Sequence, residues 1–261
     1  MIKAKKSLGQ NFLIDKNIIE KIVNLVDIEK KEILEIGPGT GNLTSALIKK
    51  NPKKIYVIEK DNSLASILEN EYAGQINVIN KDILDYDESS ISKEKLIVFG
   101  NLPYNISTEI LCKWILNLDD DKVWFSNLIL MFQKEVADRI ISNFNLSTYG
   151  RLSILANWKL NIEKVSDIKS NSFSPKPKVD STLLFFSLKN KFFPIKNPYN
   201  LEKITRIFFS HRRKMIKKPY NQIFSNNEVS NKLNLNLNLR PQNLNFDTYY
   251  KLTSEFEKLR N

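Results

Sequence analysis

The chain has 261 residues, of which 42% are hydrophobic and 26% charged, a size and composition that suit one substantial α/β domain and a smaller second domain. One cysteine and one histidine exclude an intrachain disulfide and any zinc site that needs several such ligands, so we expect no metal. No run of eighteen apolar residues occurs, which predicts no membrane span, and the single cysteine fits a cytoplasmic location.

Positive charge is concentrated toward the C-terminal end of the chain. Residues 190–261 hold 14 Lys or Arg against 5 Asp or Glu, a net charge of +9, whereas the other 189 residues carry 26 against 24. A nearly neutral body with a basic extension predicts a catalytic unit joined to an electrostatic grip on a polyanion such as nucleic acid.

Short apolar runs alternate with amphipathic stretches over the first part of the chain, a pattern typical of βα units around a parallel sheet. We predict strands at residues 33–36, 54–58, 76–79, 96–99, 123–132 and 179–188. We predict helices at residues 14–26, 42–50, 61–72, 107–116 and 133–141, with Asp61 capping the third of them.

The last seventy residues have a different character. Two prolines within residues 192–198 predict a linker, and helices are expected at 201–209 and 247–259, the second capped by Asp247. Residues 233–239 alternate leucine with asparagine, but asparagine is a poor strand former, so we predict a loop or a frayed helix end there. The pattern predicts an α/β catalytic domain over 1–189 and a smaller, basic, mainly helical domain over 190–261.

A glycine-rich turn follows the first predicted buried strand, in the sequence Glu-Ile-Gly-Pro-Gly-Thr-Gly at residues 35–41. Glycines at alternate positions such as Gly37 and Gly39 let the backbone approach a ligand closely. Glu59 closes the next strand, 22 residues after Gly37, where a carboxylate can accept hydrogen bonds from both ribose hydroxyls. Asp82 follows the third strand, where its carboxylate can accept a hydrogen bond from the amino group of an adenine. Together these residues predict a nucleoside site.

The tetrapeptide Asn101-Leu102-Pro103-Tyr104 follows the fourth strand, at the sheet edge where open α/β folds place ligands. The amide oxygen of Asn101 and the carbonyl oxygen of Leu102 can accept hydrogen bonds from the two N–H groups of an adenine amino group. These hydrogen bonds localise the nitrogen lone pair for attack on a sulfonium methyl group. Pro103 fixes the loop, and Tyr104 offers a ring on which an extruded base can stack. Catalysis of this kind rests on positioning and electrostatics.

The chain resembles the ribosomal RNA adenine dimethyltransferases, and specifically the small-subunit branch of the KsgA type. The matching segments follow the family order and are residues 5–13, 35–41, 100–107, 131–137, 149–153, 173–181 and 212–214. The resemblance implies a Rossmann-like methyltransferase sheet with a smaller helical C-terminal domain. It also implies dimethylation, by S-adenosylmethionine, of two adjacent adenosines in a hairpin loop near the 3′ end of small-subunit (16S) rRNA.

The resemblance further assigns roles to single residues. The residues implied to hold the cofactor are Asn11, Leu13, Gly37, Gly39, Glu59, Asp82 and Asn101. Asn101 is also implied to activate the target nitrogen, and Tyr104 and Phe173 to sandwich the target base. Arg212, Arg213 and Lys214 are adjacent cations that would point around most of a helix, so at least one is expected to reach phosphate. The implied partner is small-subunit rRNA within the pre-30S particle, bound by a monomer.

Two other functions compete with this one. Macrolide-resistance methyltransferases, which act on large-subunit rRNA, resemble the chain throughout, but they tend to carry lysine at the position of Thr40 and isoleucine at that of Leu102. Thr40, Leu102 and the Leu8-Gly9 pair therefore favour the small-subunit branch. The second alternative is a ribosome assembly factor or transcription-factor-like protein that binds nucleic acid without turnover. The complete glycine turn and Asn-Leu-Pro-Tyr loop argue that chemistry is retained.

Overall fold

The computed structural model describes residue 5, residues 8–118 and residues 123–259 of the chain. These residues fall into two units, each drawn from three stretches of sequence. Unit 1 comprises Met1–Lys113, Leu118–Ala137 and Ile162–Leu188, and unit 2 comprises Trp114–Asn117, Asp138–Asn161 and Lys189–Asn261. No helix in the described part of the chain is long and apolar enough to cross a membrane.

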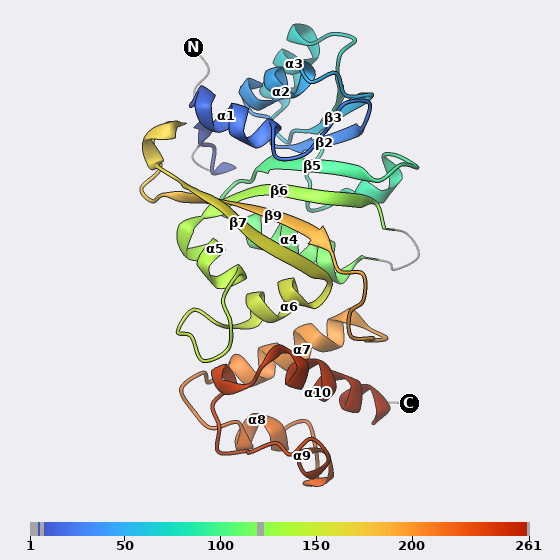
Figure 1. Ribbon diagram of the computed structural model, residues 1–261, viewed down its shortest axis with the longest axis vertical. Coiled ribbons are helices and arrows are strands. Elements are labelled where there is room, and N and C mark those ends of the chain that lie inside the picture. The colour runs from blue at the N-terminus through green and yellow to red at the C-terminus, as the bar shows by residue number, and fades with distance from the viewer. Residues whose placement is uncertain (1–4, 6–7, 119–122, 260–261) are drawn as a thin grey trace. The chain divides into compact units, whose positions relative to one another are not determined.

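A seven-stranded sheet runs in the order β4-β3-β2-β5-β6-β9-β7 (Figure 1). Its strands are β2 (Glu32–Ile36), β3 (Lys54–Ile58), β4 (Asn77–Ile79), β5 (Leu96–Asn101), β6 (Phe125–Gln133), β7 (Leu160–Ile168) and β9 (Ser181–Leu188). Neighbouring strands from β4 through β6 are parallel, whereas β9 is antiparallel to β6. The carboxyl ends of five strands therefore lie at one edge, where a ligand site is expected.

Helices follow the strands in the predicted βα order. They are α1 (Lys16–Val23), α2 (Asn42–Ile48), α3 (Asn62–Glu71), α4 (Ser107–Leu116) and α5 (Lys134–Ile140). The cap predicted for α3 is confirmed, because the side chain of Asp61 accepts a hydrogen bond from Ser63 N at 3.0 Å. Asp15 caps α1 in the same way, through Asn17 N and Ile18 N.

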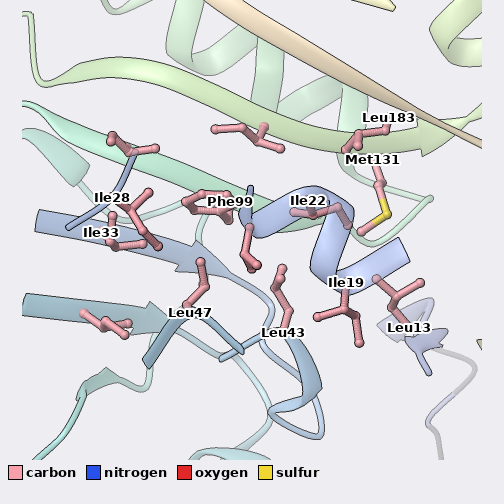
Figure 2. Close-up of a cluster of buried hydrophobic side chains, with 14 of the residues drawn as sticks. Leu13, Ile19, Ile22, Ile28, Ile33, Leu43, Leu47, Phe99, Met131 and Leu183 are labelled. Carbon is pink, nitrogen blue, oxygen red and sulfur yellow. The ribbon is translucent and has the colours of Figure 1, made fainter. Parts of the chain in front are cut away.

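The core of unit 1 is a layer of aliphatic and aromatic side chains between the sheet and the first two helices (Figure 2). Ile19 and Ile22 come from α1 and Leu47 from α2, and they meet strand residues such as Phe99, all with 7% exposure or less. Burial of each such side chain contributes about 1.5–3 kcal/mol to the folded state. This packing fixes α2 against the sheet, and with it the glycine turn that connects β2 to α2.

A two-stranded ribbon, which the sequence did not predict, ties the N-terminal segment to a distant part of unit 1. Strands β1 (Phe12–Leu13) and β8 (Phe173–Ser174) pair antiparallel, with Leu13 opposite Phe173. Ile14 N donates to Ser172 O at 2.9 Å, which extends the pairing by one residue. The N-terminal segment is thereby held across the carboxyl edge of the sheet rather than left as a free extension.

Unit 2 is mainly helical, as expected, and is built around aromatic rings. Its helices are α6 (Arg151–Lys159), α7 (Pro198–Phe209), α8 (Lys217–Asn221), α9 (Glu228–Lys232) and α10 (Phe246–Lys258). Tyr149 meets Phe209 and Phe246 edge-on, with ring centroids 6.2 and 5.4 Å apart. Tyr250 Oη donates to Ile154 O at 3.1 Å, which joins α10 to α6.

Two details of unit 2 test the sequence-based expectations. The predicted cap Asp247 is wrong: Asn245 caps α10 by accepting from Thr248 N at 2.9 Å, and Asp247 lies in the first turn. Asn245 wins because its extended backbone precedes the first helical residue and aims the amide oxygen at the unpaired N–H groups. Residues 233–239 form a loop of turns, one of the two structures expected there. Its carbonyl groups at Leu237 and Leu239 accept hydrogen bonds from the backbone at the start of α8.

Glu35 is a carboxyl group buried within β2. Its side chain accepts a hydrogen bond from Thr44 Oγ1 at 2.6 Å, and it has 2% exposure. Burial raises the pKa of Glu35 to about 8, the Thr44 hydrogen bond opposes that shift, and the nearby Glu59 carboxylate reinforces it. The folded protein therefore holds this group in its neutral form at neutral pH.

We expect Glu35→Gln to flatten the dependence of stability on pH. The unfolded chain releases this proton near pH 4.5 and the folded chain near pH 8. Between these values folding takes up a proton, so the free energy of unfolding falls as pH rises, by up to about 1.4 kcal/mol per pH unit. Urea denaturation of both proteins from pH 5 to pH 8 measures the difference. Parallel curves for the variant and the wild type would show that Glu35 does not titrate in this way.

Candidate active site

A pocket opens at the carboxyl edge of the sheet and lies entirely within unit 1. Five segments line it, and each carries at least one residue predicted from the sequence. They are residues 8–13, the turn at 35–40 with Asn42 and Leu43, the end of β3 at 58–60, residues 81–84 and the loop at 101–106. The predicted residues Asn11, Leu13, Gly37, Gly39, Glu59, Asp82, Asn101, Leu102, Pro103 and Tyr104 all lie on this lining.

The glycine turn has one glycine that faces the pocket and one that supports it. Gly37 has φ +63° and Gly39 φ +59°, a backbone conformation that side chains disfavour. A Cβ on Gly37 would lie 4.0 Å from Asn101 O and Pro103 Cδ, so it would fit beside the loop without a clash and would occupy part of the pocket. A Cβ on Gly39 would come within 2.6 Å of the Phe12 ring, so Gly39 is required for the N-terminal segment to pack here.

Glu59 lies at the base of the pocket with 7% exposure. One carboxylate oxygen accepts from Gly39 N at 3.2 Å and the other from Asp61 N at 2.8 Å. Burial raises the pKa of Glu59, whereas these backbone hydrogen bonds oppose the rise. Each oxygen retains a second lone pair, so the carboxylate can also accept hydroxyl hydrogens from a ligand. This geometry fits the ribose-binding role predicted for it.

Asp82 also lines the pocket and is ionised at neutral pH. Its Oδ1 accepts from Leu84 N at 3.0 Å, and its Oδ2 pairs with Lys60 Nζ at 2.5 Å. The hydrogen bond from Lys60 holds the pKa of Asp82 below its ordinary value. The Lys60 side chain is 56% exposed, so this ion pair costs little to rearrange when a ligand amino group approaches the carboxylate.

Lys113, on α4, fixes the wall that carries Asp82, a role the sequence did not reveal. Its ammonium group donates to Ile83 O at 2.6 Å, to Tyr86 O, and to Glu88 Oε1 at 2.9 Å. These three acceptors satisfy all three ammonium hydrogens with the side chain only 18% exposed. The segment after Asp82 is thereby held against α4.

The N-terminal segment orients the Asn-Leu-Pro-Tyr loop (residues 101–104), the predicted catalytic loop. Asn101 Nδ2 donates a hydrogen bond to the backbone carbonyl of Asn11 at 2.6 Å. This contact fixes which end of the amide carries the NH₂ group, so the other end presents the acceptor oxygen. Leu102 is buried with 1% exposure, which anchors the loop behind the pocket. Pro103 O accepts from Ile106 N at 3.1 Å in the turn that leads into α4.

Phe173 does not line the pocket. Its side chain has 2% exposure and belongs to the core cluster between the sheet and the first helices. The structure therefore brings Tyr104 to the pocket but not its predicted partner. The residue of the same sequence segment that reaches the catalytic loop is Ser181, whose hydroxyl lies 2.5 Å from Tyr104 Oη.

The N-terminal segment closes the pocket through polar contacts as well as through the β1–β8 ribbon. Lys5 Nζ forms an ion pair with Asp61 at 2.8 Å, and Gln10 Nε2 donates to the same carboxylate at 3.2 Å. Asn42 Nδ2 donates to Leu13 O at 2.8 Å. Asn11 and Leu13, the two residues predicted to cover the cofactor, are thus held at the pocket by the Asp61 contacts made before them in the chain and by the Asn42 contact at Leu13 itself.

The basic triplet predicted to bind RNA lies in unit 2, in the turn after α7 rather than on a helix. The helix stops at Phe209, so the three side chains do not spread around a helical face. Arg212 turns inward, and its guanidinium donates to Leu146 O at 3.2 Å. Arg213 and Lys214 are exposed and remain available to a polyanion.

A mostly parallel sheet with a glycine turn, a carboxylate at the end of the next strand and an Asn-Leu-Pro-Tyr loop at the same edge defines a Rossmann-like methyltransferase. Residues 1–258 match the family model of the ribosomal RNA adenine dimethylases. The chain therefore belongs to the ribosomal RNA adenine dimethylase family. Its predicted fold class and enzyme class are confirmed, and the methyl donor of this family and fold is S-adenosylmethionine.

Individual relatives extend the match over the whole chain. A ribosomal RNA small subunit methyltransferase A of Pelagibacter ubique (strain HTCC1062) is 64% identical over 260 residues, 99% of each chain. The protein of the same name from Ehrlichia ruminantium (strain Gardel) is 42% identical over 95% of each chain. The crystal structure of a dimethyladenosine transferase from Plasmodium falciparum has a TM-score of 0.80 and 26% identity, covering 95% of this chain and 98% of that one.

We expect Gly37→Ala to weaken cofactor binding without unfolding the protein. Its Cβ would enter the pocket, whereas Gly74→Ala offers a matched control: Gly74 has φ +77°, and its Cβ would meet nothing within 4 Å. Both variants should lose about 1–2 kcal/mol of stability from left-handed backbone strain. Calorimetric titration with S-adenosylmethionine should show weaker binding for Gly37→Ala alone. Equal affinities in the two variants would contradict the assignment of Gly37.

Proposed function

We propose that this enzyme dimethylates N6 of two adjacent adenosines in a hairpin loop near the 3′ end of small-subunit (16S) rRNA. Its substrate is the pre-30S particle, and it acts as a cytoplasmic monomer with a role in small-subunit biogenesis. The single observation that carries the chemistry is the contact of Asn101 Nδ2 with Asn11 O, which leaves the amide oxygen as the acceptor for an amino group. The small-subunit target is supported by the relatives at 64% and 42% identity, both of which bear that name.

The pocket residues fit S-adenosylmethionine. The missing Cβ of Gly37 leaves room beside the turn for the methionine part of the cofactor. Glu59 accepts hydrogen bonds from the ribose hydroxyls, and Asp82 accepts one from the adenine amino group. Asn11 and Leu13 cover the cofactor from the N-terminal side, and Gly39 lets that cover pack by accommodating Phe12. When bound, S-adenosylmethionine supplies a sulfonium methyl carbon that takes the nitrogen lone pair as its carbon–sulfur bond breaks.

The chain's own contribution is to prepare the target nitrogen. The amide oxygen of Asn101 and the backbone carbonyl of Leu102 accept its two hydrogens, which draws the nitrogen out of conjugation with the ring and localises its lone pair. Pro103 restricts the backbone that carries the Leu102 carbonyl. The protein supplies no strong base, because the methylated nitrogen is acidic and releases its proton to solvent.

Tyr104 is assigned to stack on the target base, since its ring lies on the pocket lining. The second stacking partner implied by the family resemblance is Phe173. Its ring is packed in the core opposite Leu13, so it reaches a base only if the β1–β8 ribbon opens. In the conformation described, Phe173 supports the N-terminal cover instead.

Affinity for rRNA is assigned to unit 2. It holds 18 Lys or Arg against 6 Asp or Glu, a net charge of +12, whereas unit 1 has 22 against 23. A docking domain that begins near residue 190 would thus be reinforced by residues 138–161, which belong to the same unit. Within it, Arg213 and Lys214 contact phosphates, and Arg212 holds the backbone at Leu146.

The large-subunit alternative is distinguished by substrate. The structure of the 23S rRNA methyltransferase ErmE has a TM-score of 0.68 at 22% identity, which is a likeness of fold alone. We expect methylation of immature small subunits and none of naked large-subunit rRNA, measured by transfer of labelled methyl groups. Mass spectrometry of 16S rRNA from cells that lack the protein should show two adjacent unmethylated adenosines. The opposite substrate preference would overturn the proposal.

We expect Asn101→Ala to lower kcat by at least about a hundredfold while RNA affinity stays within about twofold. The substitution removes a hydrogen-bond acceptor that acts on the nitrogen in the transition state, a type of contact worth about 2.7–4 kcal/mol. Steady-state kinetics on immature small subunits and a filter-binding assay measure the two effects. Unchanged turnover would refute the role of Asn101, and a loss of RNA affinity alone would indicate a binding role.

We expect the double variant Arg213→Ala/Lys214→Ala to weaken RNA binding and to reduce its salt dependence. Loss of two phosphate contacts should lower the slope of log K against log salt by about 1–2. The matched control is Lys16→Ala/Lys21→Ala, which removes the same charge from exposed positions on α1 in unit 1. An equal change in slope for both variants would mean that net charge, rather than this turn, determines the affinity.

A further inference from the structure

The segment from Phe173 to Ser181 contacts the catalytic loop through its second end. The hydroxyl groups of Ser181 and Tyr104 lie 2.5 Å apart, within hydrogen-bond distance. Ser181 has no exposed surface, so water does not compete for its hydroxyl from the side of the sheet. The contact joins β9 directly to the aromatic residue of the Asn-Leu-Pro-Tyr loop.

Ser181 is held in place by the sheet. It is the first residue of β9 and pairs with Gln133 at the end of β6. The preceding residue, Asp180, accepts a hydrogen bond from Lys134 N at 3.0 Å on its carbonyl and from Ser170 N at 2.9 Å on its carboxylate. The backbone on both sides of the hydroxyl is therefore fixed, and Ser181 offers Tyr104 a stationary partner.

The Tyr104 ring needs such a partner. The backbone at Tyr104 lies in the turn between β5 and α4, and Pro103 restricts only the torsion before it. The second side-chain torsion of a tyrosine has a broad preference, so backbone geometry alone does not determine the plane of the ring. A hydrogen bond at the phenolic oxygen fixes the direction of the ring axis, and with it the first torsion. Because the phenolic O–H bond prefers to lie in the plane of the ring, the same hydrogen bond also restrains the second torsion.

We propose that Ser181 is a positioning residue that holds the Tyr104 ring in the plane on which the target base stacks. The proposal rests on the assignment of Tyr104 as a stacking residue, and it gives the segment that contains Phe173 a different link to the site. Phe173 is buried in the core, whereas Ser181 reaches the loop that handles the base. Orienting the ring before the base arrives lowers the entropy cost of stacking.

A double-mutant cycle with Ser181→Ala, Tyr104→Phe and the combined variant tests the proposal on immature small subunits. Each single variant loses the same hydrogen bond, so each should lower kcat by about two- to tenfold with the KM for S-adenosylmethionine unchanged. The combined variant should lose no more than either single variant. Multiplied losses, or full kcat in Ser181→Ala, would overturn the proposal.

Thr182→Val is the matched control. Thr182 is the next residue of β9 and is equally buried, but its hydroxyl donates to Asp167 Oδ1 at 2.7 Å, away from the catalytic loop. It should lose stability in a thermal denaturation assay while kcat stays within about twofold. A fall in kcat equal to that of Ser181→Ala would assign the effect to general loosening of β9.

A measurement that needs no activity separates this inference from the proposed function. In protein labelled with ¹³C at the tyrosine ζ carbon, the Tyr104 signal is identified by its absence in Tyr104→Phe. Ser181→Ala should shift that signal, and Thr182→Val should leave it in place. A shifted signal in an enzyme that does not methylate small subunits would refute the proposed substrate but keep the positioning contact, whereas an unshifted signal would overturn the contact itself.

Discussion

The hydrogen bond from Asn101 to the carbonyl oxygen of Asn11 joins the part of the chain that covers the cofactor to the part that handles the target nitrogen. An amide side chain is nearly symmetric in shape, and only its hydrogen-bond partners decide which end presents oxygen. A backbone carbonyl accepts and never donates, so it selects the NH₂ end. The chemistry proposed for Asn101 depends on that selection, and so it depends on where the N-terminal segment lies.

Several contacts, none strong by itself, place that segment. The Lys5 side chain is 51% exposed in its ion pair with Asp61, so the pair contributes at most about 1 kcal/mol. Packing of Phe12 over Gly39 and the pairing of Leu13 with Phe173 add apolar burial. A cover held by many modest contacts can open to admit the cofactor and close again. Phe173, one of the two residues predicted to stack on the base, thereby also helps to hold the N-terminal segment over the pocket.

The sequence predicted the central sheet well because physical constraints act locally there. Each of the six predicted strands lies within two residues of its observed bounds, since buried runs are bounded by turn residues. β7 was missed because it is an edge strand: more than half of its residues are polar or charged, so no apolar alternation appears. β1 and β8 are two residues each, too short for any periodic signal.

Site residues divide in the same way. The sequence predicted that Glu59, Asp82 and Asn101 share one edge of the sheet because each lies at or just after the end of a predicted strand, and all three line the pocket. Ser181 and Lys113 act through a partner at distances of 77 and 25–30 residues along the chain, and nothing in a serine or a lysine specifies such a partner. The role of Phe173 came from resemblance, and its burial is a property of the folded core that no spacing encodes.

The uneven charge of the two units follows from the energetics proposed for the target base. Extruding a base from a folded RNA costs a few kcal/mol, and stacking on one aromatic ring returns about 1–3 kcal/mol. Unit 1, with a net charge of −1, adds no net attraction for phosphate to cover the difference. Phosphate contacts made by the +12 unit can offset that cost. Under the proposed function, specificity for adenosine would reside in the pocket, and the free energy that brings the adenosine there would come from unit 2.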